Sequence, residues 1–122
     1  MTDRYLPSHE WARAEGAEVV VGLSAFAAGE IGDVIHVGLP KIGATVVRGT
    51  PCAEIESVKS VNDYYSPLDG VVTAVNPVLA DHPELVNQDP GGTGWFAKVK
   101  PAKPGWAEGL LSAEQYQAGL KK

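Results

Sequence analysis

The sequence predicts a mainly β fold, a sandwich or flattened barrel of two small sheets, in a single domain that spans residues 1–122. Short runs rich in β-branched residues recur along the chain, and few of them are long enough for a helix. The 14 glycines and 9 prolines exceed average usage and place tight turns between these runs. A hydrophobic fraction of 44% and a charged fraction of 20% are ordinary for a globular chain, which excludes a disordered one.

Six short runs are the expected strands, and they cover residues 18–21, 34–37, 45–47, 53–56, 71–75 and 95–99. Glycines stand between most of these runs, as is typical of all-β proteins with closely spaced turns. We therefore expect the β core to span about residues 18–100. Between the last two runs, residues 79–86 have room for one helical turn or so, which Pro83 interrupts.

Capping residues predict two further helices. Ser24 is a suitable N-cap for a short helix over Ala25–Ile31, because its side-chain oxygen can accept a hydrogen bond from the first turn. Ser112 and Gln115 have the spacing of a capping box, in which each side chain bonds the backbone N–H of the other. This second helix belongs to a C-terminal helical extension over about residues 104–120, which follows a break rich in Pro and Gly.

Charge and composition narrow the classes of function. The chain has 10 basic and 15 acidic residues, a net charge of −5, and so lacks the basic surface of a nucleic-acid binder. No apolar stretch approaches the roughly 18 residues of a membrane span, and the N-terminus has neither a signal nor a transit pattern, which predicts a cytoplasmic protein. Cys52 is the only cysteine, so no intrachain disulfide is expected. No metal site is expected, because His9, His36 and His82 lack ligand spacing.

One lysine stands apart from the other charges of the chain. Between Arg48 and Lys98 the only formal cation is Lys59. The same stretch contains seven carboxylates, namely Glu54, Glu56, Asp63, Asp69, Asp81, Glu84 and Asp89. Acidic neighbours favour the charged form of a lysine, so a nucleophilic or Schiff-base role fits poorly. A covalently modified lysine fits better, and a lysine that only keeps an edge hairpin soluble is the other interpretation.

The residues around this lysine have the pattern of a β-hairpin. The preceding strand alternates between two faces, one made of Ala53, Ile55 and Ser57 and the other of Glu54, Glu56 and Val58. A second extended run begins at Asn62. The hairpin tip is therefore expected at residues 58–60, where the Lys59 ammonium would lie in solvent.

The same residues resemble a known family. The run Glu56-Ser57-Val58-Lys59-Ser60, with Asp63 four residues after the lysine, is similar to the lipoyl-attachment signature of the glycine cleavage system H proteins. The resemblance runs from about Tyr5 to the C-terminal helix. Its other motifs follow in order: Ser8-His9-Glu10-Trp11, Val21-Gly22-Leu23-Ser24, Ile31-Gly32-Asp33-Val34, Leu39-Pro40, Gly43, Ser66-Pro67-Leu68-Asp69-Gly70, Val75-Asn76, Pro83-Glu84-Leu85-Val86-Asn87 and Gly94-Trp95.

This resemblance implies a hammerhead fold of the lipoyl/biotinyl type and a carrier that performs no catalysis itself. Lys59 would bear lipoate through an amide bond, flanked by Glu56, Ser57, Val58 and Ser60. The implied partners are a pyridoxal-phosphate-dependent glycine decarboxylase, a tetrahydrofolate-dependent aminomethyltransferase and dihydrolipoamide dehydrogenase. A lipoate ligase or a lipoyl/octanoyl transferase would attach the group. No nucleic acid or membrane partner is implied, and the free protein is expected to be a monomer.

The resemblance also implies a surface cleft into which the loaded arm folds back. The positions that match this cleft are Ser8, Glu10 and Asp63. We expect Glu10 and Asp63 to accept charge-assisted hydrogen bonds from the ammonium of the cargo, while nearby apolar side chains exclude water. The alternative for both carboxylates is ordinary surface charge.

Four other functions are weaker matches. A biotin carrier normally has methionines beside its lysine, and Met1 is the only methionine here. A lipoyl domain of a 2-oxoacid dehydrogenase usually has an acidic residue immediately before the lysine, where this chain has Val58. A hydrolase built on Cys52 and His36 lacks a local nucleophile signature. An H-like protein that relays lipoyl groups to other enzymes keeps the same chemistry, and it is the main alternative.

Overall fold

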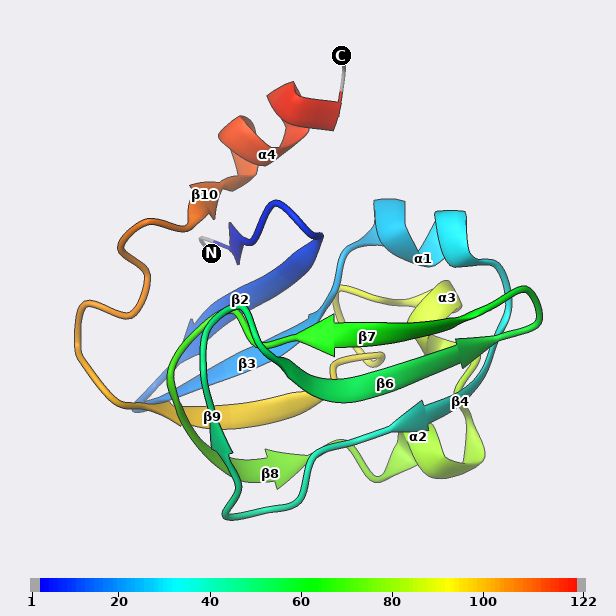
Figure 1. Cartoon of the computed structure of the whole chain (residues 1–122), viewed down its shortest axis with the longest axis horizontal. Coiled ribbons are helices and arrows are strands. Elements are labelled where there is room, and N and C mark those ends of the chain that lie inside the picture. The colour runs from blue at the N-terminus through cyan, green and yellow to red at the C-terminus, as the bar shows by residue number, and fades with distance from the viewer. Residues whose placement is uncertain (1–2, 121–122) are drawn as a thin grey trace.

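The computed structural model of the chain describes residues 3–120 and consists of two antiparallel sheets with four short helices (Figure 1). The larger sheet has the strand order β10-β1-β2-β3-β9-β8-β5, and the smaller has the order β4-β6-β7. The strands of the larger sheet are β1 (Arg4–Tyr5), β2 (Glu10–Glu15), β3 (Glu18–Leu23), β5 (Thr45–Val46), β8 (Gly70–Val75), β9 (Ala97–Pro101) and β10 (Leu111–Ser112). Those of the smaller are β4 (Val34–Gly38), β6 (Pro51–Ser57) and β7 (Val61–Tyr65).

The predicted mainly β fold is confirmed, but the two sheets are unequal and neither is a closed barrel. The larger sheet has seven strands because residues near both ends of the chain join it. Arg4 of β1 pairs with Ala12 of β2 on one side and with Ser112 of β10 on the other. Three strands of this sheet, β1, β2 and β10, thus lie outside residues 18–100.

The helices follow the capping signals. Helix α1 covers Ala25–Ile31, and the Ser24 hydroxyl accepts a hydrogen bond from the Ala27 N–H at 3.2 Å, so this helix and its N-cap are confirmed. The predicted helical turn near Pro83 is divided into α2 (Val78–Asp81) and α3 (Leu85–Gln88). A proline in this segment cannot donate a backbone hydrogen bond, which accounts for the division.

Helix α4 (Ala113–Leu120) begins with the predicted capping box. The Ser112 N–H donates to Gln115 Oε1 at 2.9 Å, and the Gln115 N–H donates to Ser112 Oγ at 3.1 Å. The helix is much shorter than the predicted extension, because residues 102–110 form turns and bends. Its buried residue, Tyr116, stacks on Tyr5 with ring centroids 4.2 Å apart and so packs the helix on the N-terminal segment.

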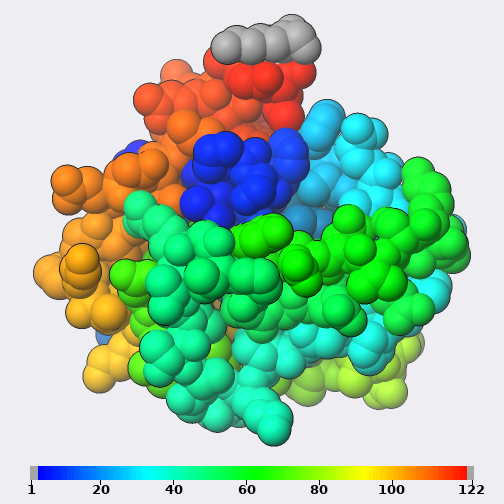
Figure 2. Space-filling view, in the orientation of Figure 1, coloured from blue at the N-terminus to red at the C-terminus, as the bar shows by residue number. Residues whose placement is uncertain are grey.

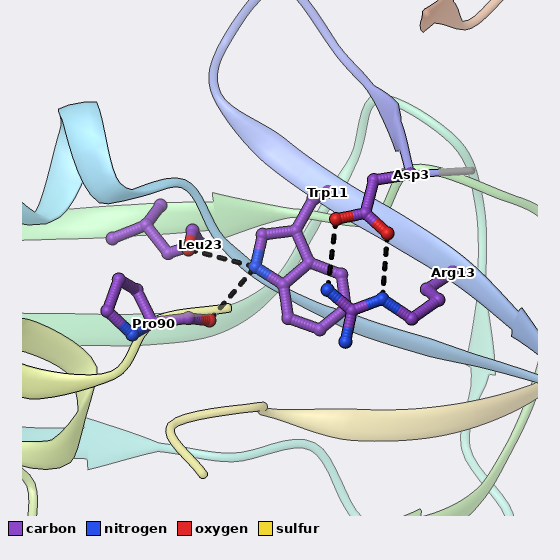
Figure 3. Close-up of polar contacts among 5 residues, drawn as sticks. All are labelled: Asp3, Trp11, Arg13, Leu23 and Pro90. Carbon is purple, nitrogen blue, oxygen red and sulfur yellow. Dashed lines mark hydrogen bonds and ion pairs between the residues drawn. The ribbon is translucent and has the colours of Figure 1, made fainter. Parts of the chain in front are cut away.

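Buried apolar side chains from both sheets form one core, to which α1, α2 and α3 also contribute. Trp11 on β2 lies at its edge and is held by two hydrogen bonds, from Nε1 to the Leu23 carbonyl at 2.9 Å and to the Pro90 carbonyl at 3.0 Å (Figure 3). The Arg13 guanidinium lies over the indole and forms a two-pronged ion pair with Asp3. These contacts fix the strand whose first residue is Glu10.

Candidate functional site

The hairpin β6–β7 carries Lys59 at its tip, as the sequence predicts (Figure 1). Glu56 and Val61 are the last paired residues, so the tip is formed by residues 57–60. Ile55 and Ser57 are buried, whereas Glu54 and Val58 are exposed, which confirms the alternation of the strand.

Ser57 closes the tip from inside. Its N–H donates to the Ser60 carbonyl at 2.8 Å. Its buried hydroxyl oxygen accepts from the Lys59 N–H at 3.3 Å and from the Ser60 N–H at 3.1 Å. The backbone on both sides of the lysine side chain is therefore held in place, as a functional group on a rigid scaffold requires.

The turn between α1 and β4 supports the tip from the side. The Val58 N–H donates to the Asp33 carbonyl at 3.0 Å. Gly32 lies against the stem of Lys59, so closely that a Cβ atom at position 32 would be 2.9 Å from Lys59 Cε. The tip is thus attached to the turn after α1 by this backbone hydrogen bond and this side-chain contact, in addition to the pairing of Ser57 with Val34 of β4.

The ammonium of Lys59 is exposed and, within residues 3–120, forms no ion pair or hydrogen bond. Lys98 on β9 differs, because its Nζ binds Glu15 Oε1 at 2.8 Å and lies 5.6 Å from the centre of the Trp95 indole ring. Lys59 Nζ is therefore accessible to another macromolecule without the loss of a hydrogen bond or an ion pair.

A surface cleft of about 280 Å³ is lined by residues of β7 and of α1. Figure 2 shows the green hairpin and the cyan α1 beside each other on the surface, with the blue N-terminal segment next to both. Asn62 and Ile31 line the cleft close to the tip. Tyr65 lines it about 10 Å further along, given a rise of roughly 3.3 Å per strand residue.

The structure brings together the three residues that the sequence predicts for a cleft. Ser8, Glu10 and Asp63 all line this one cavity, although they come from the N-terminal loop, from β2 and from β7. Their side chains differ in exposure, because Ser8 and Asp63 are exposed whereas Glu10 is buried.

Glu10 is a buried carboxylate with hydrogen bonds and no counter-ion among residues 3–120. Its exposed fraction is 2%. The Ser8 hydroxyl donates to Oε1 at 2.5 Å and the Tyr65 N–H donates to Oε2 at 3.2 Å. Burial raises the pKa of Glu10, and the two hydrogen bonds lower it by less. Because the charged form is deprived of water, a cation that enters the cleft would be attracted to this carboxylate.

Two sets of contacts around the site could not be predicted from the local sequence pattern. His9 has a positive φ of 85°, and its Nδ1 forms a hydrogen bond with the Tyr116 hydroxyl at 2.6 Å. The same hydroxyl bonds Ser24 Oγ at 2.7 Å, so α4 is connected to the N-cap of α1 at the wall of the cleft.

The second set belongs to Asn87 of α3. Its Nδ2 donates to the carbonyls of Gly32 at 2.9 Å and Ala28 at 3.2 Å, and its Oδ1 accepts from the Val34 N–H at 2.8 Å. One side chain thus holds the turn that supports the tip. Asn87 ends one of the motifs of the resemblance, but the sequence gives no indication of this role.

A family model described as Glycine cleavage H-protein matches residues 3–122 of the chain. The chain is also 47% identical over 117 residues to the glycine cleavage system H protein of Magnetococcus marinus, a match that covers 96% of this chain and 84% of that relative. The chain belongs to the glycine cleavage H-protein family. The resemblance seen in the sequence is thereby confirmed.

A second relative and a solved structure agree. The glycine cleavage system H protein of Myxococcus xanthus is 46% identical over 118 residues, which are 97% of this chain and 92% of the relative. A crystal structure of a glycine cleavage system H protein from Mycobacterium marinum has a TM-score of 0.88 at 35% identity and covers 98% of this chain and 97% of that one. The hammerhead architecture implied by the resemblance is confirmed.

The family is the lipoyl carrier of the glycine cleavage system, so the chain is a carrier component and not itself a catalyst. Its partners belong to that system. No three His, Cys, Asp or Glu side chains within residues 3–120 are grouped as metal ligands. Of the helices that the structure describes, none has the length and apolar character to cross a membrane.

Proposed function

We propose that Lys59 is the residue that carries the lipoyl group in this chain. The observation that supports the proposal is the placement of an exposed, unpaired ammonium on a tip whose backbone is fixed by Ser57 and Asp33. A ligase or transferase that attaches lipoate needs such access to the lysine. When attached, the group supplies a disulfide that accepts, carries and releases an aminomethyl unit.

The proposed partners are those that the resemblance implies. Glycine decarboxylase would load the aminomethyl unit, the aminomethyltransferase would remove it to tetrahydrofolate, and dihydrolipoamide dehydrogenase would reoxidise the dithiol. An arm on a docked carrier makes each encounter intramolecular, which raises its effective concentration in each active site. A cytoplasmic location and a monomeric free state stay predictions.

We further propose that the cleft protects the cargo, with Glu10 as its principal charged residue. The cargo amine is cationic near neutral pH. A carboxylate that is 2% exposed and has no counter-ion within residues 3–120 is complementary to such a cation. Ser8 orients this carboxylate, and Asp63 contributes a second, exposed carboxylate. Leu23, Phe26 and Ile31 also line the cleft and reduce the access of water to the cargo.

Intact mass and isotope exchange test the attachment site and the function together. After expression with a lipoate source, the mass of the chain should increase by one lipoyl amide, and Lys59→Arg should abolish the increase. Lys98→Arg is the matched control, because its lysine is paired with Glu15, and it should still be modified. An unchanged mass of the wild-type chain, or a lipoyl group on the Lys59→Arg chain, would contradict the attachment site.

The lipoylated chain should then support glycine–bicarbonate exchange by the decarboxylase, whereas the Lys59→Arg chain should not. A lipoylated chain that supports no exchange, but passes its lipoyl group to another enzyme, would identify a relay protein instead.

A further inference from the structure

We propose that Gly32 is a positioning residue for Lys59. The bare backbone at this position lets the lysine stem lie across the end of α1, so that the arm starts on the side of the tip where the cleft opens. The inference rests on the proposed function of Lys59. It adds that Gly32 determines the direction in which the lipoyl arm leaves the tip.

The contact between Gly32 and Lys59 leaves no room for a side chain. A Cβ atom at position 32 would lie 2.9 Å from Lys59 Cε, 3.7 Å from Cδ and 3.8 Å from Cγ. Carbon atoms attract one another best at about 3.5–4.0 Å, so 2.9 Å is a steric overlap. Three successive atoms of the stem face this one residue, which means that the stem runs along it.

The lysine is the part that would yield to a larger residue at position 32. Lys59 Cε is near the end of a flexible, exposed side chain, and the three heavy atoms nearest to that Cβ position all belong to this side chain. Rotation of the lysine would relieve this overlap, while the strain from the positive φ of 80° at position 32 would remain in the backbone. The residue type at position 32 therefore decides which directions are open to the lysine.

The turn that contains Gly32 is fixed on the opposite side. Asn87 bonds the Gly32 carbonyl and the Val34 N–H, at 2.9 Å and 2.8 Å, and the Asp33 carbonyl between them accepts the Val58 N–H. Gly32 thus has a defined position relative to the residue before Lys59. A fixed turn can orient a side chain, whereas a mobile turn would follow it.

The position of Gly32 relates the lysine to the cleft. Ile31, the preceding residue, lines the cleft, and so does Asn62, whose Nδ2 donates to Ser60 Oγ at 2.9 Å on the other side of the tip. A stem that lies on Gly32 therefore starts at the residue that follows Ile31, one of the cleft residues.

The first test uses the unmodified wild-type chain and requires no variant. NMR on labelled protein should show a nuclear Overhauser contact between the Gly32 α-protons and the Lys59 ε-protons. Absence of this contact in the folded chain would overturn the proposal. Because no lipoyl group is needed, this result is independent of the attachment experiment.

The second test compares Gly32→Ala with Gly49→Ala. Both glycines have a positive φ, 80° and 81°, so both variants strain the backbone. Only Gly32 faces Lys59, since the Cβ position at Gly49 has no atom within 4 Å. We expect the Gly32→Ala chain to lose the contact between the α-proton of residue 32 and the Lys59 ε-protons, while Gly49→Ala retains it. A Lys59 side chain with identical shifts in both variants and the wild type would refute the assignment.

The lipoylated forms of the same three chains measure the consequence for the arm. Lipoylation should shift the amide resonances of Ile31 and Asn62 in the wild type and in Gly49→Ala, and this shift should be lost in Gly32→Ala. Equal shifts in all three chains would show that Gly32 does not direct the arm, while leaving Lys59 as the attachment site. A chain that is not modified at Lys59 would instead contradict the proposed function.

Discussion

At the tip of the β6–β7 hairpin, the fixed contacts are made by the backbone and by Ser57, and Lys59 Nζ has no partner within residues 3–120. At the start of β2, Glu10 is the opposite case, because it is buried and both of its oxygens accept hydrogen bonds. A side chain that must travel between enzymes needs a rigid base and a free end. A carboxylate that must meet a cation at one place needs to be oriented in advance and kept from water.

Apart from the substitution of Lys59 itself, Glu10→Ala should have the largest effect of the substitutions that test this comparison. Hydrogen bonds to charged groups are worth about 1.5–3 kcal/mol, so loss of the carboxylate should speed the release of formaldehyde and ammonia from the loaded carrier by roughly tenfold or more. Release can be followed by a formaldehyde assay on purified carrier. Glu54→Ala is the control, because Glu54 is exposed on β6 and does not line the cleft. Unchanged release from the Glu10→Ala chain would remove Glu10 from the cleft assignment.

Ser57→Ala tests whether the tip depends on its one buried hydroxyl. The substitution removes the acceptor for the Lys59 and Ser60 N–H groups and should lower the free energy of unfolding by about 1 kcal/mol. Amide exchange at these two positions should become faster, while Lys59 is still lipoylated. Ser60→Ala is the matched control, because Ser60 is exposed and its hydroxyl meets only the side chains of Ser57 and Asn62, with no bond from a backbone N–H within residues 3–120. If urea unfolding and amide exchange of the two variants agree, Ser57 does not hold the tip.

Asp63→Asn sharpens the comparison within the cleft. Asp63 is exposed, and interactions between exposed charges are worth only about 0.2–1 kcal/mol. We therefore expect the loaded carrier to release its cargo about twofold faster, which is much less than for Glu10→Ala. The same formaldehyde assay applies. An effect as large as that of Glu10→Ala would mean that burial is not what distinguishes the two carboxylates.

The smallest expected effect is a change in how stability depends on pH. Burial raises the pKa of Glu10 in the folded chain, so the folded state holds this proton more tightly than the unfolded state does. The free energy of unfolding should therefore fall as the pH rises from the ordinary glutamate value of about 4.3 to the raised value. The Glu10→Gln chain has no such proton and is the control. Urea unfolding of both chains between about pH 4 and pH 7 should show that the wild type loses stability relative to the variant as the pH rises. If the free energies of unfolding of the two chains change in parallel with pH, the raised pKa of Glu10 does not contribute to stability.

Local signals in the sequence predicted the parts of the site that depend on neighbouring residues. Ser24 and Ala27 are three residues apart, as are Ser112 and Gln115, so both caps follow from spacing. The alternation before Lys59 likewise predicted a hairpin with the lysine at its tip. These features depend on the two-residue and near-four-residue periods of strands and helices, which any chain shows in its sequence.

The remaining features depend on residues that only the fold brings together. Burial of Glu10 requires the N–H of Tyr65, 55 residues away, and the support of the tip requires Asn87, which is 55 residues from Gly32. A polar residue in a loop or short helix has many possible partners, and no periodicity selects among them. The motifs of the family resemblance include Glu10, Gly32 and Asn87 but not Tyr65, and they did not indicate the contacts of these residues.

The pairing of β1 with β10 has a consequence for how the protein is made. Arg4 is translated 108 residues before its partner Ser112, and Tyr5 is likewise made long before its partner Leu111. The Tyr116 phenol that connects His9 to Ser24 is made later still. In a nascent chain, one edge of the larger sheet therefore stays unpaired until translation has passed residue 116. An unpaired strand edge favours binding by chaperones during this period.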